Sequence, residues 1–101
     1  MTVYNKLVRD KIPEIIEADG QKPNIKILSN SENAFREKLL EETHEFLAYG
    51  KAEELADILE VVFALSEEVC HKSKDELLEI YQNKHNERGG FSKKIFLVSV
   101  E

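Results

Sequence analysis

A glycine between two long helical patterns constrains the fold of this chain most. Apolar residues at helical spacing run from about Ser31 to Ala48 before Gly50 and from about Ala52 to Cys70 after it. A glycine directly after a helical pattern is typical of a helix C-terminus. Because the break is so short, the sequence predicts a tight antiparallel helical hairpin.

The segments outside this hairpin predict two further helices and two short strands. Residues 4–18 have helical spacing in two pieces around Pro13, and residues 73–88 form a fourth helical pattern. Residues 24–28 alternate apolar and polar, and residues 95–100 are apolar and rich in β-branched side chains, which is typical of strands. Since an unpaired strand exposes its hydrogen-bonding edge, we expect the two strands to pair with each other. The predicted fold class is all-α, a single helical-bundle domain over residues 1–101 with a small two-stranded β appendage.

Composition and charge exclude several classes of function. The chain has 101 residues, with 20 acidic against 14 basic side chains and a net charge of −6, which argues against a nucleic-acid partner. No apolar run approaches the roughly 20 residues that span a bilayer, so we expect no membrane partner. The single cysteine cannot form an intrachain disulfide and fits a reducing compartment. A cytoplasmic location is therefore expected.

Four carboxylates are expected to converge near the Gly50 turn. Glu42 and Glu45 are three residues apart on one helix face, and Glu54 and Asp57 are three apart on the next helix. The turn brings both pairs to the same level. Converging carboxylates repel one another unless a cation lies among them. All-oxygen ligands favour Mg²⁺, Mn²⁺ or Ca²⁺ over zinc.

The helix that contains Asp57 strengthens this interpretation. Between Leu55 and Leu65 only Asp57 and Glu60 are charged, so the helix is expected to be largely buried. A buried ionised Asp57 needs a partner, and neither nearby Lys51 nor any arginine of the hairpin is at a helical position that pairs with it. A metal ion would supply that partner. The alternative is that these carboxylates form a solvated helix face, as acidic residues commonly do.

Two pairs of cations are candidate phosphate ligands. Lys84 and Arg88 are four residues apart on one helix face, where they could hold phosphate oxygens or complement the helix dipole. Lys6 and Arg9 near the N-terminus could also reach a phosphate, or could be plain surface residues. Cys70 is interpreted as a core residue.

These motifs together resemble the MazG-like superfamily of all-α nucleoside triphosphate pyrophosphohydrolases. The resemblance rests on an EExxE motif at residues 41–45 and an ExxD motif at residues 54–57. The opening YNKLVRDKIPEII and the late RGGF are similar to a compact subgroup described as phosphoribosyl-ATP pyrophosphohydrolase-like or house-cleaning enzymes. The resemblance covers nearly the whole chain.

The resemblance implies Mg²⁺-dependent hydrolysis of a nucleoside triphosphate to the monophosphate and pyrophosphate, with Mn²⁺ as a possible substitute. It also implies a helical bundle that assembles as a homodimer or homotetramer. By position, the implied metal ligands are Glu42, Glu45, Glu54 and Asp57. Glu41 matches a glutamate that holds a second metal or orients the attacking water, and Lys84 and Arg88 match a phosphate-binding pair. The predicted catalytic residues are Glu41, Glu42, Lys84 and Arg88, and the predicted phosphate ligands are Lys84, Arg88, Lys6 and Arg9.

Three functions remain open from the sequence. The first is house-cleaning hydrolysis of canonical or damaged nucleoside triphosphates. The second is hydrolysis of phosphoribosyl-ATP in histidine synthesis, which uses the same diphosphate chemistry. The third is a non-enzymatic acidic helical interaction module whose carboxylates are solvated.

Overall fold

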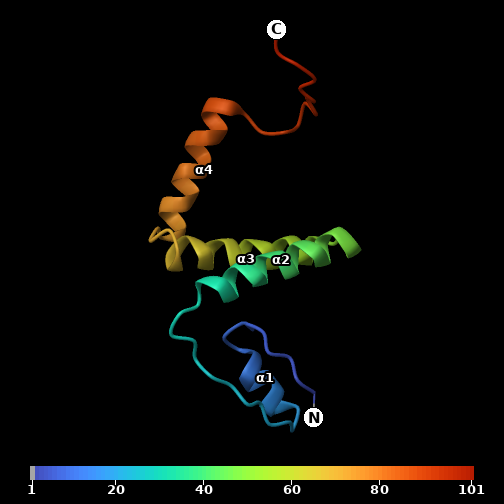
Figure 1. The fold of residues 1–101 in the computed structure, drawn as a ribbon, viewed down its shortest axis with the longest axis vertical. Coiled ribbons are helices and arrows are strands. Elements are labelled where there is room, and N and C mark those ends of the chain that lie inside the picture. Colours follow the sequence, from blue (N-terminus) through green and yellow to red (C-terminus); the bar gives the residue numbers. More distant parts are fainter. Residues whose placement is uncertain (1) are drawn as a thin grey trace.

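The chain folds into four α-helices, as the computed structural model of residues 2–101 shows (Figure 1). In chain order they are α1 (Ile12–Ala18), α2 (Glu32–Tyr49), α3 (Ala52–Glu68) and α4 (Lys74–Arg88). The predicted all-α class is confirmed. None of these helices is both long enough and apolar enough to cross a membrane.

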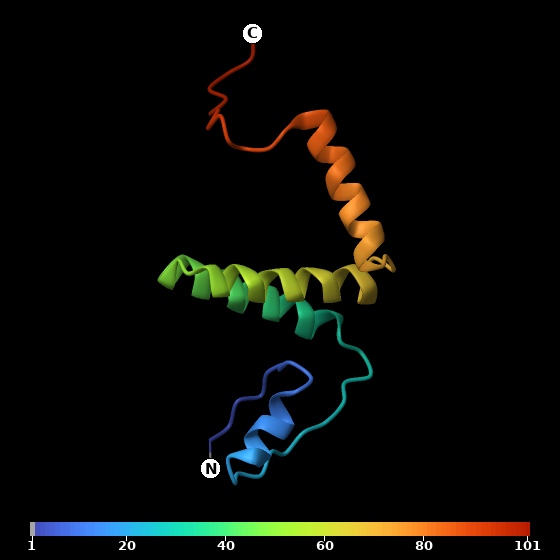
Figure 2. The same ribbon diagram turned by 180° about the vertical axis from the view of Figure 1, so that it is seen from behind.

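The hairpin of α2 and α3 forms the centre of the molecule. The two helices lie side by side along most of their length (Figures 1 and 2). Gly50 ends α2 in the left-handed conformation, with φ 66°, and its N–H donates a hydrogen bond to the Phe46 carbonyl at 2.7 Å. Only a glycine adopts this conformation without a steric cost. The predicted hairpin turn is therefore confirmed.

The connection from α3 to α4 is closed by hydrogen bonds. The Ser66 hydroxyl donates to the Lys72 carbonyl at 2.8 Å, and the Lys72 N–H donates to the Ser66 carbonyl at 2.9 Å. The Lys74 ammonium lies 4.7 Å from the centre of the Phe63 ring, a cation–π contact between α4 and α3. From this point α4 projects away from the hairpin (Figure 2).

The predicted β appendage is wrong, because residues 24–28 and 95–100 form no strand. The first segment follows α1, and the second ends the chain at the opposite end of a molecule 61 Å long (Figure 1). The two segments lie too far apart to pair with each other, so neither supplies the other with a ladder of hydrogen bonds. β-branched composition alone does not supply a partner strand.

The first helix is shorter than predicted. Residues 4–18 have helical spacing, but α1 begins only at Ile12, with Pro13 in its first turn. Proline has no backbone N–H and clashes with the preceding turn, so it starts a helix more readily than it continues one. Asn5 adopts a left-handed conformation with φ 46°, which interrupts helical geometry before that point.

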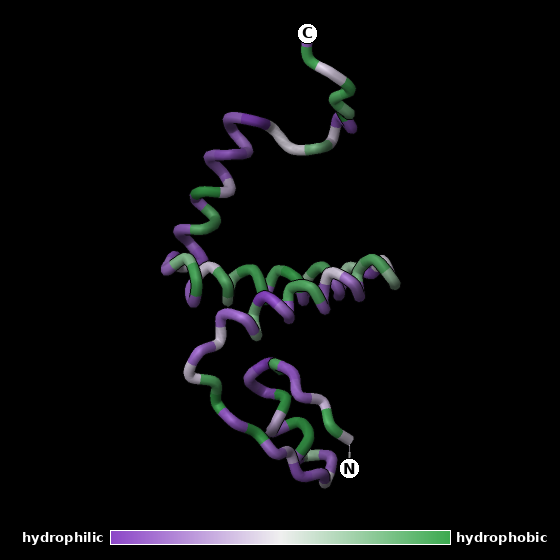
Figure 3. The backbone as a smooth tube through the Cα atoms, in the orientation of Figure 1, coloured by the Kyte–Doolittle hydropathy of each residue, from purple (hydrophilic) through white to green (hydrophobic). Residues whose placement is uncertain are grey.

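The single chain buries little of its apolar surface. Val61 is the one buried apolar residue of the part that the structure describes, and no side chain there is fully buried. Figure 3 shows long apolar stretches on α3 and on the C-terminal tail. The expectations that α3 is largely buried and that Cys70 lies in the core are wrong for the isolated chain, in which Cys70 is exposed.

Candidate metal centre

Five carboxylates from the two hairpin helices converge near the Gly50 turn. Glu41, Glu42 and Glu45 on α2 each place a carboxylate oxygen within 4.8 Å of the others, and so do Glu45, Glu54 and Asp57. Glu45 belongs to both triads and joins them across the hairpin. We refer to these five residues as the carboxylate cluster. It includes all four predicted metal ligands and Glu41.

Glu42 is the most buried member of the cluster. Only 7% of the residue is exposed. Its Oε1 lies 3.1 Å from the Lys38 Nζ, whereas its Oε2 is buried and has no hydrogen-bond partner. A buried carboxylate oxygen without a partner is energetically costly. Since a carboxylate oxygen of Glu42 lies within 4.8 Å of oxygens of Glu41 and Glu45, a cation bound among the three would give this carboxylate a second partner besides Lys38.

Three cations offset part of the negative charge. Lys38 also contacts Glu41, at 3.3 Å, and Lys6 contacts Glu41 at the same distance. Arg9 lies 2.6 Å from Asp57. If all five carboxylates are ionised, the three cations leave two negative charges, the charge that a divalent metal ion would neutralise.

The uncompensated charge lies at the centre of the cluster. Within residues 2–101, neither Glu45 nor Glu54 takes part in an ion pair. The negative charge of neighbouring Glu42 and a side-chain hydrogen bond with it raise the pKa of Glu45, with smaller contributions from burial, Glu41 and Glu54. Such mutual repulsion is expected where carboxylates share a site.

The cations alter the ionisation of their own partners in the opposite sense. Burial alone would raise the pKa of Glu41, but hydrogen bonds from Lys6 and Lys38 outweigh it and hold that pKa below its ordinary value. Burial alone would likewise lower the pKa of Lys38, but its bonds to Glu42 and Glu41 raise it. Lys38 and Glu41 are therefore both ionised at neutral pH.

Two of these cations change the interpretation based on sequence. Asp57 has no cationic partner within the hairpin, as expected, but Arg9 reaches it from outside the hairpin. The metal is therefore not the only possible partner of Asp57. Sequence reasoning also missed Lys38, although its spacing of three and four residues from Glu41 and Glu42 could have identified it.

The other predicted phosphate ligands lie elsewhere. Lys84 and Arg88 line an open surface cavity of about 500 Å³ around the end of α4, together with aromatic, histidine and glycine residues that are all exposed. The remaining lining residues are Tyr81, His85, Gly89, Gly90 and Phe91. This end of α4 is far from the hairpin (Figures 1 and 2). Within one chain, the structure does not bring Lys84 and Arg88 to the carboxylate cluster.

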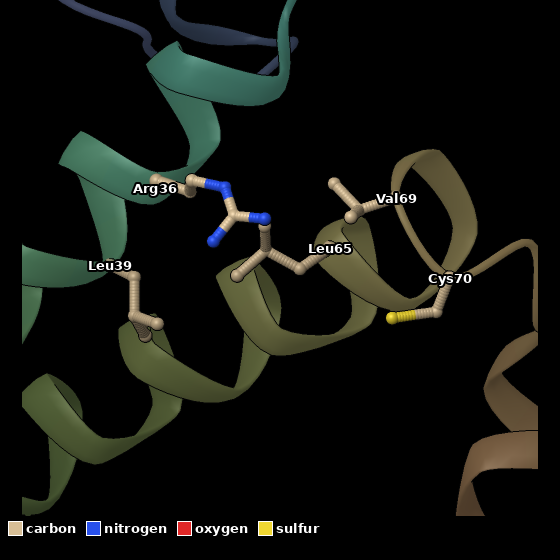
Figure 4. A pocket seen from close by; sticks show the side chains of 5 residues that line it. All are labelled: Arg36, Leu39, Leu65, Val69 and Cys70. Carbon is tan, nitrogen blue, oxygen red and sulfur yellow. The ribbon is translucent and has the colours of Figure 1, made fainter.

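A second cavity, of about 350 Å³, lies between α2 and the end of α3 (Figure 4). It is lined by Leu39, Leu65, Val69, Cys70 and Arg36, whose side chain reaches toward Leu65 (Figure 4). Arg36 pairs with Glu32 rather than with any member of the carboxylate cluster. This cavity is apolar and contributes no candidate catalytic group.

Comparisons of the chain with protein-family models, with curated proteins and with solved structures find no match. The site is therefore described by its own geometry: a carboxylate cluster on the hairpin and a cationic, aromatic cavity on α4.

Proposed function

We propose that the chain is a Mg²⁺-dependent nucleoside triphosphate pyrophosphohydrolase of the MazG-like type. The buried Glu42 Oε2 carries this proposal, because it lacks a partner within a cluster that retains two uncompensated negative charges. The EExxE and ExxD motifs that contain these carboxylates resemble the motifs of that superfamily, which supports the proposal. All-oxygen ligands select Mg²⁺ or Mn²⁺ rather than zinc.

Each member of the carboxylate cluster has a chemical role in this proposal. Glu42, Glu45, Glu54 and Asp57 would hold the ion, which supplies charge neutralisation at the phosphates when bound. Glu41, ionised at neutral pH, would accept a hydrogen bond from the attacking water and orient it. Water adds to the α-phosphorus and passes a proton to a carboxylate of the cluster, the bond from the α-phosphorus to the oxygen that bridges it to the β-phosphorus breaks, and the monophosphate and pyrophosphate leave.

The substrate-side groups would come from α4. Lys84 and Arg88 would donate hydrogen bonds to phosphate oxygens and stabilise the charge on the departing pyrophosphate. The aromatic rings of Tyr81 and Phe91 in the same cavity could stack on a base. The cavity therefore suits a ligand with both an aromatic and a polyanionic part.

We further infer that the active form is a homo-oligomer, most simply a homodimer. The chain exposes 9313 Å², whereas a compact monomer of 11.7 kDa exposes roughly 5,900 Å². The excess exceeds the area of about 1,000–2,500 Å² that one subunit buries in an obligate homodimer. The exposed apolar residues Leu40 and Leu47 on α2 and Leu55 and Leu59 on α3 would be covered by a second hairpin.

The first experiment is pyrophosphate release from a panel of canonical and modified nucleoside triphosphates and phosphoribosyl-ATP, with Mg²⁺ and with EDTA. Metal-dependent release from a nucleoside triphosphate supports the proposal. Preference for phosphoribosyl-ATP would instead assign the chain to histidine synthesis. If no substrate of the panel releases pyrophosphate and Mg²⁺ does not raise the melting temperature, the non-enzymatic interaction module would be favoured.

Asp57→Asn is the matched test of the site. The variant keeps the shape of the side chain but loses a charged metal ligand, so we expect Mg²⁺-dependent turnover to fall by about 100-fold or more with the fold retained. Asp75→Asn is the control, since Asp75 lies in the exposed first turn of α4, away from the cluster. Undiminished turnover by Asp57→Asn would contradict the metal assignment.

A further inference from the structure

The N-terminal segment, residues 2–11, is connected to the hairpin through the carboxylate cluster. Among the described helices, α1 packs against neither α2 nor α3. Instead, Lys6 donates a hydrogen bond to Glu41 and Arg9 donates one to Asp57. The segment thus places one cation on each carboxylate triad.

These two contacts occupy oxygens that a divalent cation would use. The Lys6 and Arg9 side chains are 43% and 53% exposed, and exposed ion pairs contribute little to stability. A divalent ion within the triads would carry the charge of both cations on a single atom. It would also repel both side chains at short range. The two modes of neutralisation therefore compete.

The remaining contacts of the segment are few enough for it to move. Residues 2–11 contain no helix or strand, and Leu7 is their one residue that is not exposed. The backbone of Asn5 is in the left-handed region, with φ 46°. The two polar contacts with the cluster are the side-chain hydrogen bonds that join the segment to the hairpin.

We propose that residues 2–11 form a strap that closes over the carboxylate cluster in the metal-free protein and is released when a divalent cation binds there. Lys6 and Arg9 substitute for part of the charge of the ion. The proposal rests on the metal site of the proposed function, to which the unpartnered Glu42 Oε2 independently points. Release of the strap would also free both cations for the phosphates of a substrate.

The strap is tested by ¹⁵N relaxation of the full chain during titration with Mg²⁺, with binding followed separately by calorimetry. We expect the backbone order parameters of Lys6 and Arg9 to fall from about 0.8 to below about 0.6 as the site fills. Residues of α2 and α3 should stay rigid. In the double variant Lys6→Gln/Arg9→Gln, the segment should be mobile before Mg²⁺ is added. That variant should bind Mg²⁺ about three- to tenfold more tightly.

The matched control is Lys11→Gln/Lys22→Gln, which removes the same charge from two exposed lysines outside the cluster. It should respond to Mg²⁺ as the original chain does. If calorimetry shows Mg²⁺ binding but the order parameters of residues 2–11 do not change, the strap proposal is contradicted, whereas the proposed metal site is supported. If no variant binds Mg²⁺, the metal site fails and the strap fails with it.

Discussion

Lys38 is the cation placed most deeply in the carboxylate cluster. Only 14% of its side chain is exposed, and it bridges Glu41 and Glu42 from the preceding turn of α2. Unlike Lys6 and Arg9, it belongs to the hairpin itself. It therefore provides the internal charge compensation that lets Glu42 remain buried when no metal is bound.

We predict that Lys38→Met destabilises the metal-free protein by about 1–3 kcal/mol, because Glu42 is then left buried without a cation. Saturating Mg²⁺ should recover much of this loss, since the ion supplies the missing charge. The measurement is urea unfolding in EDTA and in Mg²⁺.

Arg36→Met is the control for this prediction. Arg36 is on the same helix but forms an exposed pair with Glu32, so its loss should change the free energy of unfolding by less than about 0.5 kcal/mol, with or without Mg²⁺. Equal destabilisation of Lys38→Met in EDTA and in Mg²⁺ would show that no ion compensates Glu42.

At the residue scale, the sequence predicts the convergence of the carboxylates but not their full set of partners. Helical spacing and a short turn are local features, so the sequence alone predicts that four carboxylates converge. These are Glu42, Glu45, Glu54 and Asp57. Arg9 lies 48 residues from Asp57 in the chain, and no local pattern relates them. The contact could be learned only from the folded structure.

Among the elements, α4 has the best-defined start. The Ser73 hydroxyl accepts a hydrogen bond from the Glu76 N–H at 3.1 Å, and the Glu76 carboxylate accepts one from the Ser73 N–H at 3.0 Å. This reciprocal pair is a capping box. It fixes where the helix begins and hence the direction in which Lys84 and Arg88 are carried away from the hairpin.

We predict a pH dependence of stability from this cap. The backbone hydrogen bond from Ser73 lowers the pKa of Glu76 from its ordinary value of 4.5. Between the two pKa values the unfolded chain binds more protons, so the stabilisation is complete above pH 4.5 and is lost as the pH falls through the folded-state pKa. Glu76→Gln should lower the free energy of unfolding at pH 6, and the difference from the original chain should shrink toward pH 3.

Glu79→Gln on the same helix is the control, because no side-chain hydrogen bond to Glu79 is found within residues 2–101. Its effect should not vary in this way with pH. A constant difference between Glu76→Gln and the original chain across the pH range would show that the charge of the cap contributes nothing.

The helices that the sequence predicts well begin or end at residues with a clear local signal. Gly50 ends a helix at the expected place, and α2, α3 and α4 match their predicted ranges within one or two residues. The two predicted strands have no such constraint. Pairing them would require the ends of the chain to meet, and no local signal in residues 24–28 or 95–100 enforces that contact.

The molecule is much more extended than a compact domain of the same length. The radius of gyration is 17.8 Å, whereas a compact chain of this length has about 13 Å. Side chains such as Leu47 and Phe96 are 75% and 88% exposed. Helical periodicity predicts which faces are apolar but not which chain covers them. The expectation of a buried α3 therefore fails for one chain and could hold in an assembly.

The separation between the carboxylates and the α4 cations has a consequence in such an assembly. If a twofold axis relates two copies, the α4 of one subunit can approach the carboxylate cluster of the other. Each active site would then combine the Glu and Asp residues of one chain with Lys84 and Arg88 of its partner.

We predict that two inactive variants restore activity when mixed. Asp57→Asn has intact cations, and Lys84→Ala/Arg88→Ala has intact carboxylates. In a mixed dimer, one of the two shared sites contains no substitution. Random reassembly in equal amounts gives half mixed dimers, so turnover should recover to about a quarter of that of the original chain.

The measurement is pyrophosphate release after unfolding and refolding the variants together, with light scattering to establish that the dimer has formed. Each variant refolded alone is the control. If the dimer forms but the mixture stays inactive, both sets of residues must act within one chain, and α4 would have to fold back onto its own hairpin.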